Sequence, residues 1–291
     1  MILTALLVLQ ANTDSLAVRV RQLADTYLAA YFERHADEAT LDGVAKGPHD
    51  QLPDNSPAAM AQWQQHEDAW LAQLKRINPD RLEGRPEAIA YGIMRDAIES
   101  SVATRVCRFE LWSVAQSGGG GGWLSTITSL AALQAVGTDQ ARQQALARWR
   151  AVPAYIATET ANHREGLRLG LSAPRHNVEI AMGEIDTLLA TPLAQSPLYD
   201  PARRDSTPAF VAELARVIQQ EIIPAMRQYR DFLATEYLGH ARTAIGVSEN
   251  PHGSDCYRAS IRAATGLTLS PDSLHQIGIN AVEQLENGMQ M

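Results

Sequence analysis

The stretch SPAAMAQWQQHEDAWLAQLKRI, residues 56–77, decides the fold class of this chain. Ser56 followed by Pro57 is a typical helix start, because a serine side chain caps the first turn and proline suits the first helical position. The apolar side chains behind this start recur at helical spacing, which places them on one face of a helix. They are Met60, Trp63, Trp70, Leu74 and Ile77.

Similar signals on both sides predict an all-α fold, an irregular multi-helix bundle. We expect helices near residues 15–36, 57–78, 86–116, 138–170 and 208–238, and a last one from Ser270-Pro271. Pro153 predicts a kink or a break and Pro224 a bend, because proline removes a helical hydrogen bond. Residues 191–207 are rich in proline and predict an irregular crossing. Further stripes expected to face the core are Leu16, Val20, Leu23, Tyr27 and Tyr31; Ile89, Ile93 and Ala97; and Leu274, Gly278, Ala281 and Leu285.

The composition of the chain limits the classes of function that can be expected of it. The 291 residues allow one large domain or two small ones, and a hydrophobic fraction of 45% is that of a folded protein. The formal net charge is −8 and Lys and Arg form no cluster, which argues against nucleic-acid binding. A run of glycines at 118–122 lacks the Lys-Ser/Thr of a phosphate-binding loop and predicts a linker. We expect a single helical domain over residues 13–291.

Both ends of the sequence carry signals. Residues 1–9, MILTALLVL, are uncharged and lead into a polar Asn12-Thr13-Asp14. Residues 1–12 therefore fit either the remnant of a secretory signal peptide or the buried first turn of a helix, and both interpretations stay open. No other run is long and apolar enough for a membrane span. The last helix reaches Met291 without a stop signal, which suggests truncation at the C-terminus.

Zinc-peptidase helices need two histidines one turn apart and an adjacent glutamate. His66-Glu67 has the first half of this pattern, but Trp70 stands where the second histidine belongs. A surface polar patch between two packing tryptophans is the favoured interpretation. His163-Arg164-Glu165 and His275-Gln276-Ile277 fail the same test. We therefore predict neither a catalytic residue nor a metal ligand in this chain.

Other reactive side chains have simpler explanations. Cys256 could meet His240 and His252 in a ligand set or a cysteine–histidine pair, yet an isolated cysteine is more often a small buried residue. Whether it forms a disulfide with Cys107 stays open. The pair Arg203-Arg204 could clamp a carboxylate or phosphate, but solvated loop charges are favoured.

Three stretches resemble a bacterial family known as domain of unknown function 885. They are HADEATLDGVAKGPHDQLPDNSP at 35–57, DFLATEYLGHARTAIG at 231–246 and NPHGSDCYRASIRAATGLTLSPDSLHQIG at 250–278. The second resembles the family's Tyr-Leu-x-x-Ala-Arg segment, and the third its Pro-x-Gly turn followed by a Ser/Thr-Pro helix start. They occur in the family's order and spacing, and the resemblance covers nearly all of residues 15–291.

This resemblance implies that the chain is the N-terminal half of a larger, gluzincin-like helical metallopeptidase that is exported or lipid-anchored. Such proteins carry a His-Glu and a Pro-Gly-His-His stretch in their second half, so zinc is expected there and no cofactor in this chain. Two hypotheses remain: an inactive, substrate-covering half of a carboxypeptidase-like zinc peptidase or related hydrolase, or a stand-alone helical scaffold or binding module. Expected partners are the missing half, a peptide-like substrate and a second copy. A periplasmic location is favoured over a cytoplasmic one.

The segment 250–262 is our candidate for substrate binding. Asn250-Pro251 and Gly253 predict a tight turn, and loops held by rigid helices often carry function. His252, Tyr257 and Arg258 would supply a proton carrier, a phenolic donor and a cation for a substrate carboxylate. The alternative is a capped turn in which Tyr257 is buried and Arg258 pairs with Asp255.

Overall fold

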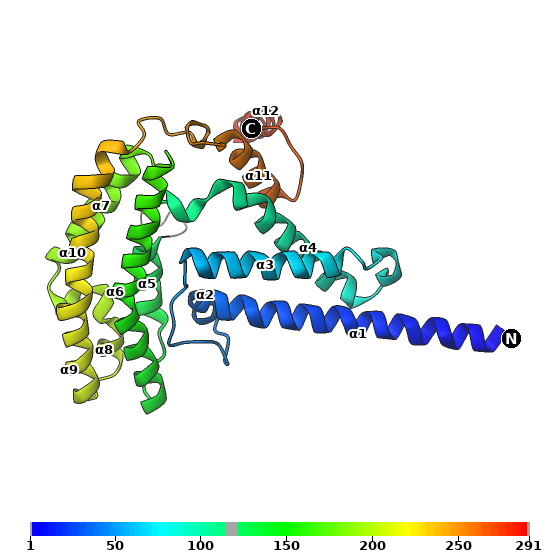
Figure 1. Ribbon diagram of the computed structural model, residues 1–291, viewed down its shortest axis with the longest axis horizontal. Coiled ribbons are helices and arrows are strands. Elements are labelled where there is room, and N and C mark those ends of the chain that lie inside the picture. Colours follow the sequence, from blue (N-terminus) through cyan, green and yellow to red (C-terminus); the bar gives the residue numbers. More distant parts are fainter. Residues whose placement is uncertain (1, 115–121, 290–291) are drawn as a thin grey trace. The chain divides into compact units, whose positions relative to one another are not determined.

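The computed structural model describes residues 2–114 and 122–289, and all regular elements within these ranges are helical (Figure 1). This confirms the predicted all-α fold. The α-helices are α1 (Ile2–Arg34), α2 (Ala36–Leu41), α3 (Pro57–Leu74), α4 (Pro86–Thr104), α5 (Trp123–Leu133), α6 (Asp139–Arg168), α7 (Arg175–Ala190), α8 (Asp200–Arg204), α9 (Pro208–Val217), α10 (Ile223–Phe232), α11 (Gly253–Thr265) and α12 (Pro271–Met289).

The contacts divide the chain into two compact units. Unit 1 consists of Met1–Asp25, Gln64–Arg108 and Gly246–Met291, and unit 2 of Thr26–Trp63 and Phe109–Ile245. The single helical domain expected over residues 13–291 stays a prediction. Within the described ranges, no helix is both long and apolar enough to cross a membrane.

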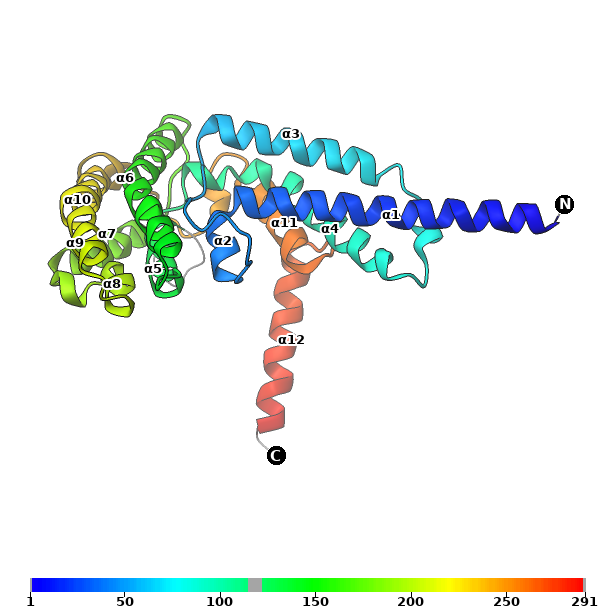
Figure 2. The ribbon, with the colours of Figure 1, turned by 90° about the horizontal axis from the view of Figure 1, so that it is seen from below.

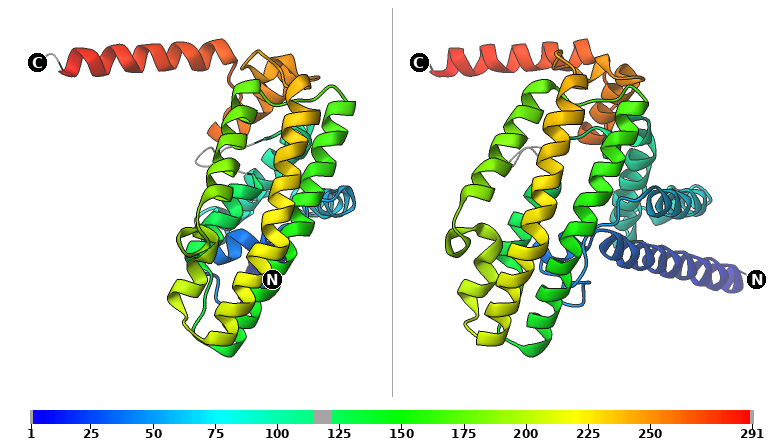
Figure 3. Two further views of the ribbon diagram at one scale, coloured as in Figure 1. Left: turned by 90° about the vertical axis from the view of Figure 1, so that its left-hand side faces the viewer. Right: turned by 60° about the vertical axis from the view of Figure 1, so that its left-hand side comes forward.

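Unit 2 is a bundle in which α6 packs against α9 and α10, and α10 also packs against α7 (Figures 1 and 3). Two π-helical turns, Ile218–Ile222 and Leu233–Tyr237, join α9, α10 and the following 3₁₀ turn Leu238–His240 into one long helical segment. Its continuous apolar face closes the core of the unit. Large side chains of that core that are at most 2% exposed include Trp149, Ile156, Ile185, Leu214, Ile218, Met226, Leu233 and Tyr237.

The two prolines expected to disturb helices are accommodated differently. Pro153 lies inside α6, which runs on to Arg168, so the chain does not break there. Pro224 follows the π-helical turn Ile218–Ile222 and occupies the first turn of α10. A π turn changes the hydrogen-bond register just where proline cannot donate, which explains how the helical segment continues.

Unit 1 contains the first part of α1, the end of α3, α4, α11 and α12. Arg21 of α1 pairs with Glu87 of α4, and Arg262 of α11 lies 3.0 Å from Asp96 of α4. A disulfide joins Cys107, in a 3₁₀ turn after α4, to Cys256 of α11. The disulfide and the Arg262 ion pair together fix α11 to the α4 region.

Several local predictions are confirmed. The Ser56 hydroxyl caps its helix by accepting a hydrogen bond from Ala59 N–H at 3.3 Å. At the start of the helix expected from residue 138, the Thr138 hydroxyl likewise accepts from Ala141 N–H at 3.2 Å. Helices begin at Pro57, Pro86, Pro208 and Pro271. In the predicted glycine linker, residues 118–121 lie outside the described ranges.

Three boundary or face predictions are wrong. The helix from Pro86 ends at Thr104 rather than 116, because Arg108 adopts a left-handed backbone with φ 49° and only short 3₁₀ turns follow. Ile89 and Ile93 are exposed at 68% and 67%, since α4 buries another face, formed by Glu87, Tyr91, Met94 and Ile98. The stripe of the last helix is not buried either, as the next subsection describes.

Candidate functional site

The segment 246–262 folds as the sequence predicts, into a tight turn that starts a helix. A 3₁₀ turn, Val247–Glu249, leads to Asn250, whose carbonyl accepts a hydrogen bond from Gly253 N–H at 2.8 Å. A Cβ atom on Gly253 would lie 1.9 Å from the Val247 carbonyl oxygen, so only glycine fits there. His252 has a left-handed backbone with φ 58° at the start of α11.

The three predicted substrate-binding residues are close together in sequence and exposed to solvent. Arg258 donates to Asp255 Oδ1 at 2.5 Å, and the His252 imidazole lies 4.0 Å from the same carboxyl group. Tyr257 is 45% exposed, so the alternative in which it is buried is wrong, whereas the predicted pairing of Arg258 with Asp255 is confirmed. The segment offers a hydroxyl, an imidazole and a neutralised guanidinium on its surface. Their role in substrate binding stays a prediction.

Helix α12 follows this segment (Figure 2), and several of its apolar side chains are exposed. The structure describes all of α12, Pro271–Met289, and none of its residues is buried. Four of its large apolar side chains, the last three of them at spacings of three and four, are exposed by 54–80%, and we call them the α12 apolar face: Ile277, Val282, Leu285 and Met289. An amphipathic helix normally buries such a face against another element.

The other candidates from the sequence have structural roles. Glu67 is buried and pairs with Arg105 at 2.8 Å, so the prediction of a surface patch at His66-Glu67 is wrong for the glutamate. Cys256 is held in the disulfide, which excludes a free nucleophilic thiol there. In the described ranges, no three His, Cys, Asp or Glu side chains are arranged to hold a metal ion.

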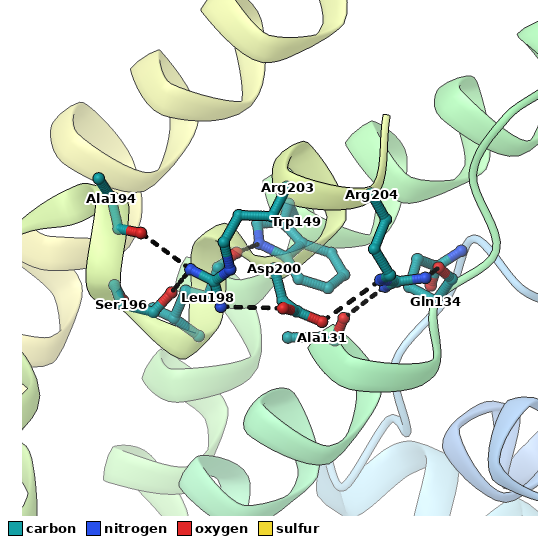
Figure 4. Close-up of polar contacts among 9 residues, drawn as sticks. All are labelled: Ala131, Gln134, Trp149, Ala194, Ser196, Leu198, Asp200, Arg203 and Arg204. Carbon is teal, nitrogen blue, oxygen red and sulfur yellow. Dashed lines mark hydrogen bonds and ion pairs between the residues drawn. The ribbon is translucent and has the colours of Figure 1, made fainter. Parts of the chain in front are cut away.

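Arg203 and Arg204 lie at the end of α8, and their side chains are exposed, as predicted, but also hydrogen-bonded (Figure 4). Arg203 donates to the carbonyls of Ala194 and Ser196 at 3.0 Å each, and Arg204 to those of Ala131 and Gln134 at 2.7 and 2.9 Å. Both also pair with Asp200, at 2.8 and 3.3 Å. The two guanidiniums thus satisfy carbonyl groups at the end of α5 and in the proline-rich crossing while they remain exposed to solvent.

The structure contains one polar site that was not predicted from the sequence. Glu159 and His163 are one turn apart on α6, and both are buried beside a small cavity in unit 2. Tyr229 of α10 lines the same cavity and its hydroxyl lies 3.2 Å from His163 Nδ1. In the sequence, the only indication of this site is that a glutamate and a histidine are four residues apart. Many surface helices have the same spacing, so it does not identify a site.

Comparisons with known proteins agree with the resemblance. The family described as "Bacterial protein of unknown function (DUF885)" matches residues 37–291. The solved structure described as "the putative lipoprotein from Colwellia psychrerythraea" is similar with a TM-score of 0.75 and 17% sequence identity. The similarity covers 93% of this chain and 50% of that one, so this chain spans half the length of the solved protein. No curated protein matches.

Proposed function

Because this chain belongs to the bacterial family of unknown function DUF885, we propose that it is the N-terminal, substrate-covering half of a zinc-dependent, carboxypeptidase-like peptidase or related hydrolase, inactive by itself. The zinc ligands and the catalytic base belong to the other half. In this proposal, residues 250–262 face the substrate, with Arg258 and Tyr257 holding a peptide carboxylate.

The α12 apolar face is the observation that carries this proposal. Four large apolar side chains on one helix are exposed, in a chain that spans half of a structurally similar protein. An exposed apolar patch of this kind marks a protein interface. In this proposal, the α12 apolar face packs against the polypeptide that follows α12 in the complete protein. In the isolated chain it promotes self-association.

The disulfide supports an exported location. Disulfides persist in the periplasm and outside the cell, and are rare in the cytoplasm. The similarity to a protein described as a lipoprotein agrees with this location.

Unit 2 supports the alternative function, a stand-alone helical scaffold or binding module. Its hydrophobic core is continuous and extends through most of its long helices, as expected of a unit that folds independently. In this alternative, the α12 face binds a different protein or a second copy.

A binding experiment distinguishes the peptidase half from the stand-alone scaffold or binding module. The segment encoded downstream of Met291 would be expressed separately and mixed with residues 1–291. We expect a stable complex that Val282→Glu with Leu285→Glu weakens at least tenfold, about 1.4 kcal/mol. Ile89→Glu is the matched control, because Ile89 is as exposed as Leu285 but lies on α4. An immediate stop codon, or no complex, would favour the scaffold.

A further inference from the structure

Helix α12 carries carboxylates along one side in addition to the α12 apolar face. Its charged residues at pH 7 are Asp272, Glu283 and Glu286. Glu286 lies four residues after Val282 and three before Met289, which places it at the border of the apolar face. Glu283 is three residues before Glu286, and Asp272 is eleven residues, about three helical turns, before Glu283. The three carboxylates therefore follow one side of the helix.

These carboxylates are not neutralised by cations of the chain itself. No Lys or Arg follows Arg262 in the sequence. Arg262 pairs with Asp96 and Arg258 pairs with Asp255, so both arginines of α11 are already engaged. Within residues 2–114 and 122–289, no side chain forms an ion pair with the α12 carboxylates. The side of α12 that borders its apolar face is therefore purely acidic.

The position of Glu286 makes a cation from outside especially favourable. The C-terminal end of a helix carries a partial negative charge, which basic side chains stabilise and acidic side chains do not. Glu286 lies in the last turn of α12, and that turn contains no basic residue. A cation beside Glu286 would offset its repulsion by the helix dipole and by the neighbouring Glu283.

We propose that the α12 apolar face is covered by a basic amphipathic helix, in which Lys or Arg residues border an apolar stripe and pair with Glu283 and Glu286. This inference rests on the proposed function, because it takes the occupant to be the polypeptide that follows α12 in the complete protein. An amphipathic helix laid on an apolar surface is a recurring mode of recognition. A second copy of α12 fits less well, because it brings further carboxylates and no cation.

The acidic side should govern how fast the partner binds, and the apolar face how slowly it leaves. Ion pairs at the rim of an interface add little affinity, but they steer the encounter of the two partners, and salt screens this effect. The test measures binding of the separately expressed segment downstream of Met291 to residues 1–291 by stopped-flow fluorescence. Between about 50 and about 500 mM sodium chloride, the association rate constant should fall about tenfold.

The variant that removes the charges is Glu283→Gln with Glu286→Gln. At low salt it should associate roughly three- to tenfold more slowly, with little dependence on salt and a nearly unchanged dissociation rate. Asp80→Asn with Glu83→Gln is the matched control, because these exposed carboxylates have the same spacing outside α12. It should change neither rate. No residue of α12 is buried, so the charge variant should keep the unfolding midpoint of the wild type.

Synthetic amphipathic peptides give a second readout that does not need the downstream segment. A peptide with lysines beside a leucine stripe should bind residues 1–291 about tenfold more tightly than its glutamate counterpart at low salt. The Glu283→Gln, Glu286→Gln variant should lose this preference. Equal affinity for the two peptides in the wild type would overturn the basic partner.

The outcomes separate this inference from the proposed function. A complex with the downstream segment that forms equally fast at both salt concentrations, or as fast in the charge variant, would overturn the basic partner and leave the proposed function in place. Faster association at high salt would do the same. Absence of any complex would overturn both, because the occupant is taken to be that segment.

Discussion

Arg148 is an extensively hydrogen-bonded side chain of unit 2, although it carries no obvious signal in the sequence. It is fully buried in α6 and donates to the carbonyls of Ala36, Pro48 and Gln51 at 2.8–3.1 Å. Its Nη1 donates to Thr40 Oγ1 at 2.9 Å and Gln134 Oε1 at 2.7 Å. Burial lowers its pKa to about 10, so it stays charged at neutral pH. One guanidinium thus fixes the segment that follows α2.

We expect Arg148→Met to lower the free energy of unfolding by about 3–5 kcal/mol, because it removes the donor to five acceptors in the buried or partly buried surroundings of this side chain. Arg150→Met, two residues away, removes only an exposed pair with Glu213 and should cost less than about 1 kcal/mol. Urea titration at pH 7 measures both. Equal losses in the two variants would show that Arg148 has no special role.

The lowered pKa of the buried His163 side chain predicts that the protein loses stability as the pH falls. Its pKa is lowered from 6.5 to about 4 by burial, so the unfolded chain binds a proton first. Its contribution is present above pH 6.5 and is lost as the pH falls toward 4, up to about 3 kcal/mol. His163→Gln should flatten the fall in stability over this range, and His176→Gln, an exposed control, should not. Parallel pH profiles of wild type and His163→Gln would contradict this.

Tyr257 and Arg258 test the proposed contact with substrate. In the complete protein, Tyr257→Phe and Arg258→Met should each raise KM several-fold at little change in stability, because both side chains are exposed. Initial rates on peptides with a free and an amidated C-terminus measure the effect. Unchanged KM in both variants would assign the segment to the scaffold.

At the scale of elements, the disulfide determines how firmly α11 is held. Cys107 and Cys256 are 149 residues apart, and α11 otherwise contributes only two buried residues of its described 13, Gly253 and Ile261. Closing so long a loop stabilises by about 3–5 kcal/mol.

Reduction of the disulfide should therefore lower the free energy of unfolding by that amount and expose α11 and α12 to hydrogen exchange. The Cys107→Ser, Cys256→Ser double variant should have the lower free energy of unfolding even without reductant, and reductant should not change it. If reductant leaves wild-type exchange in α11 unchanged, the disulfide is not what holds this helix.

Helix positions could be predicted from the sequence because caps and prolines act locally: Ser56, Thr138 and the proline starts needed no tertiary information. The buried face of α4 could not, since Ile89 and Tyr91 both fit a helical stripe and only packing decides between them. For the same reason nothing local distinguished Arg148 from Arg150. The residues of the 250–262 turn were located correctly because Gly253 and Pro251 determine the backbone there.

For the whole molecule, the central features are two compact units and a helix whose apolar face is exposed. In our proposal, self-association of the isolated chain and its complex with the following segment both depend on that face. We propose that this chain is one half of a larger enzyme, and its family membership and the fold of a protein twice as long support this proposal.

The most direct test of this claim is a side-by-side assay of zinc content and peptide hydrolysis. Residues 1–291 would be compared with the chain extended to the end of its reading frame, both purified without chelator. We predict about one zinc per extended chain, with hydrolysis that a chelator removes and zinc restores, and neither zinc nor hydrolysis for residues 1–291. Stoichiometric zinc in the short chain, or an extended chain that binds no zinc and cleaves no peptide, would contradict the proposed function.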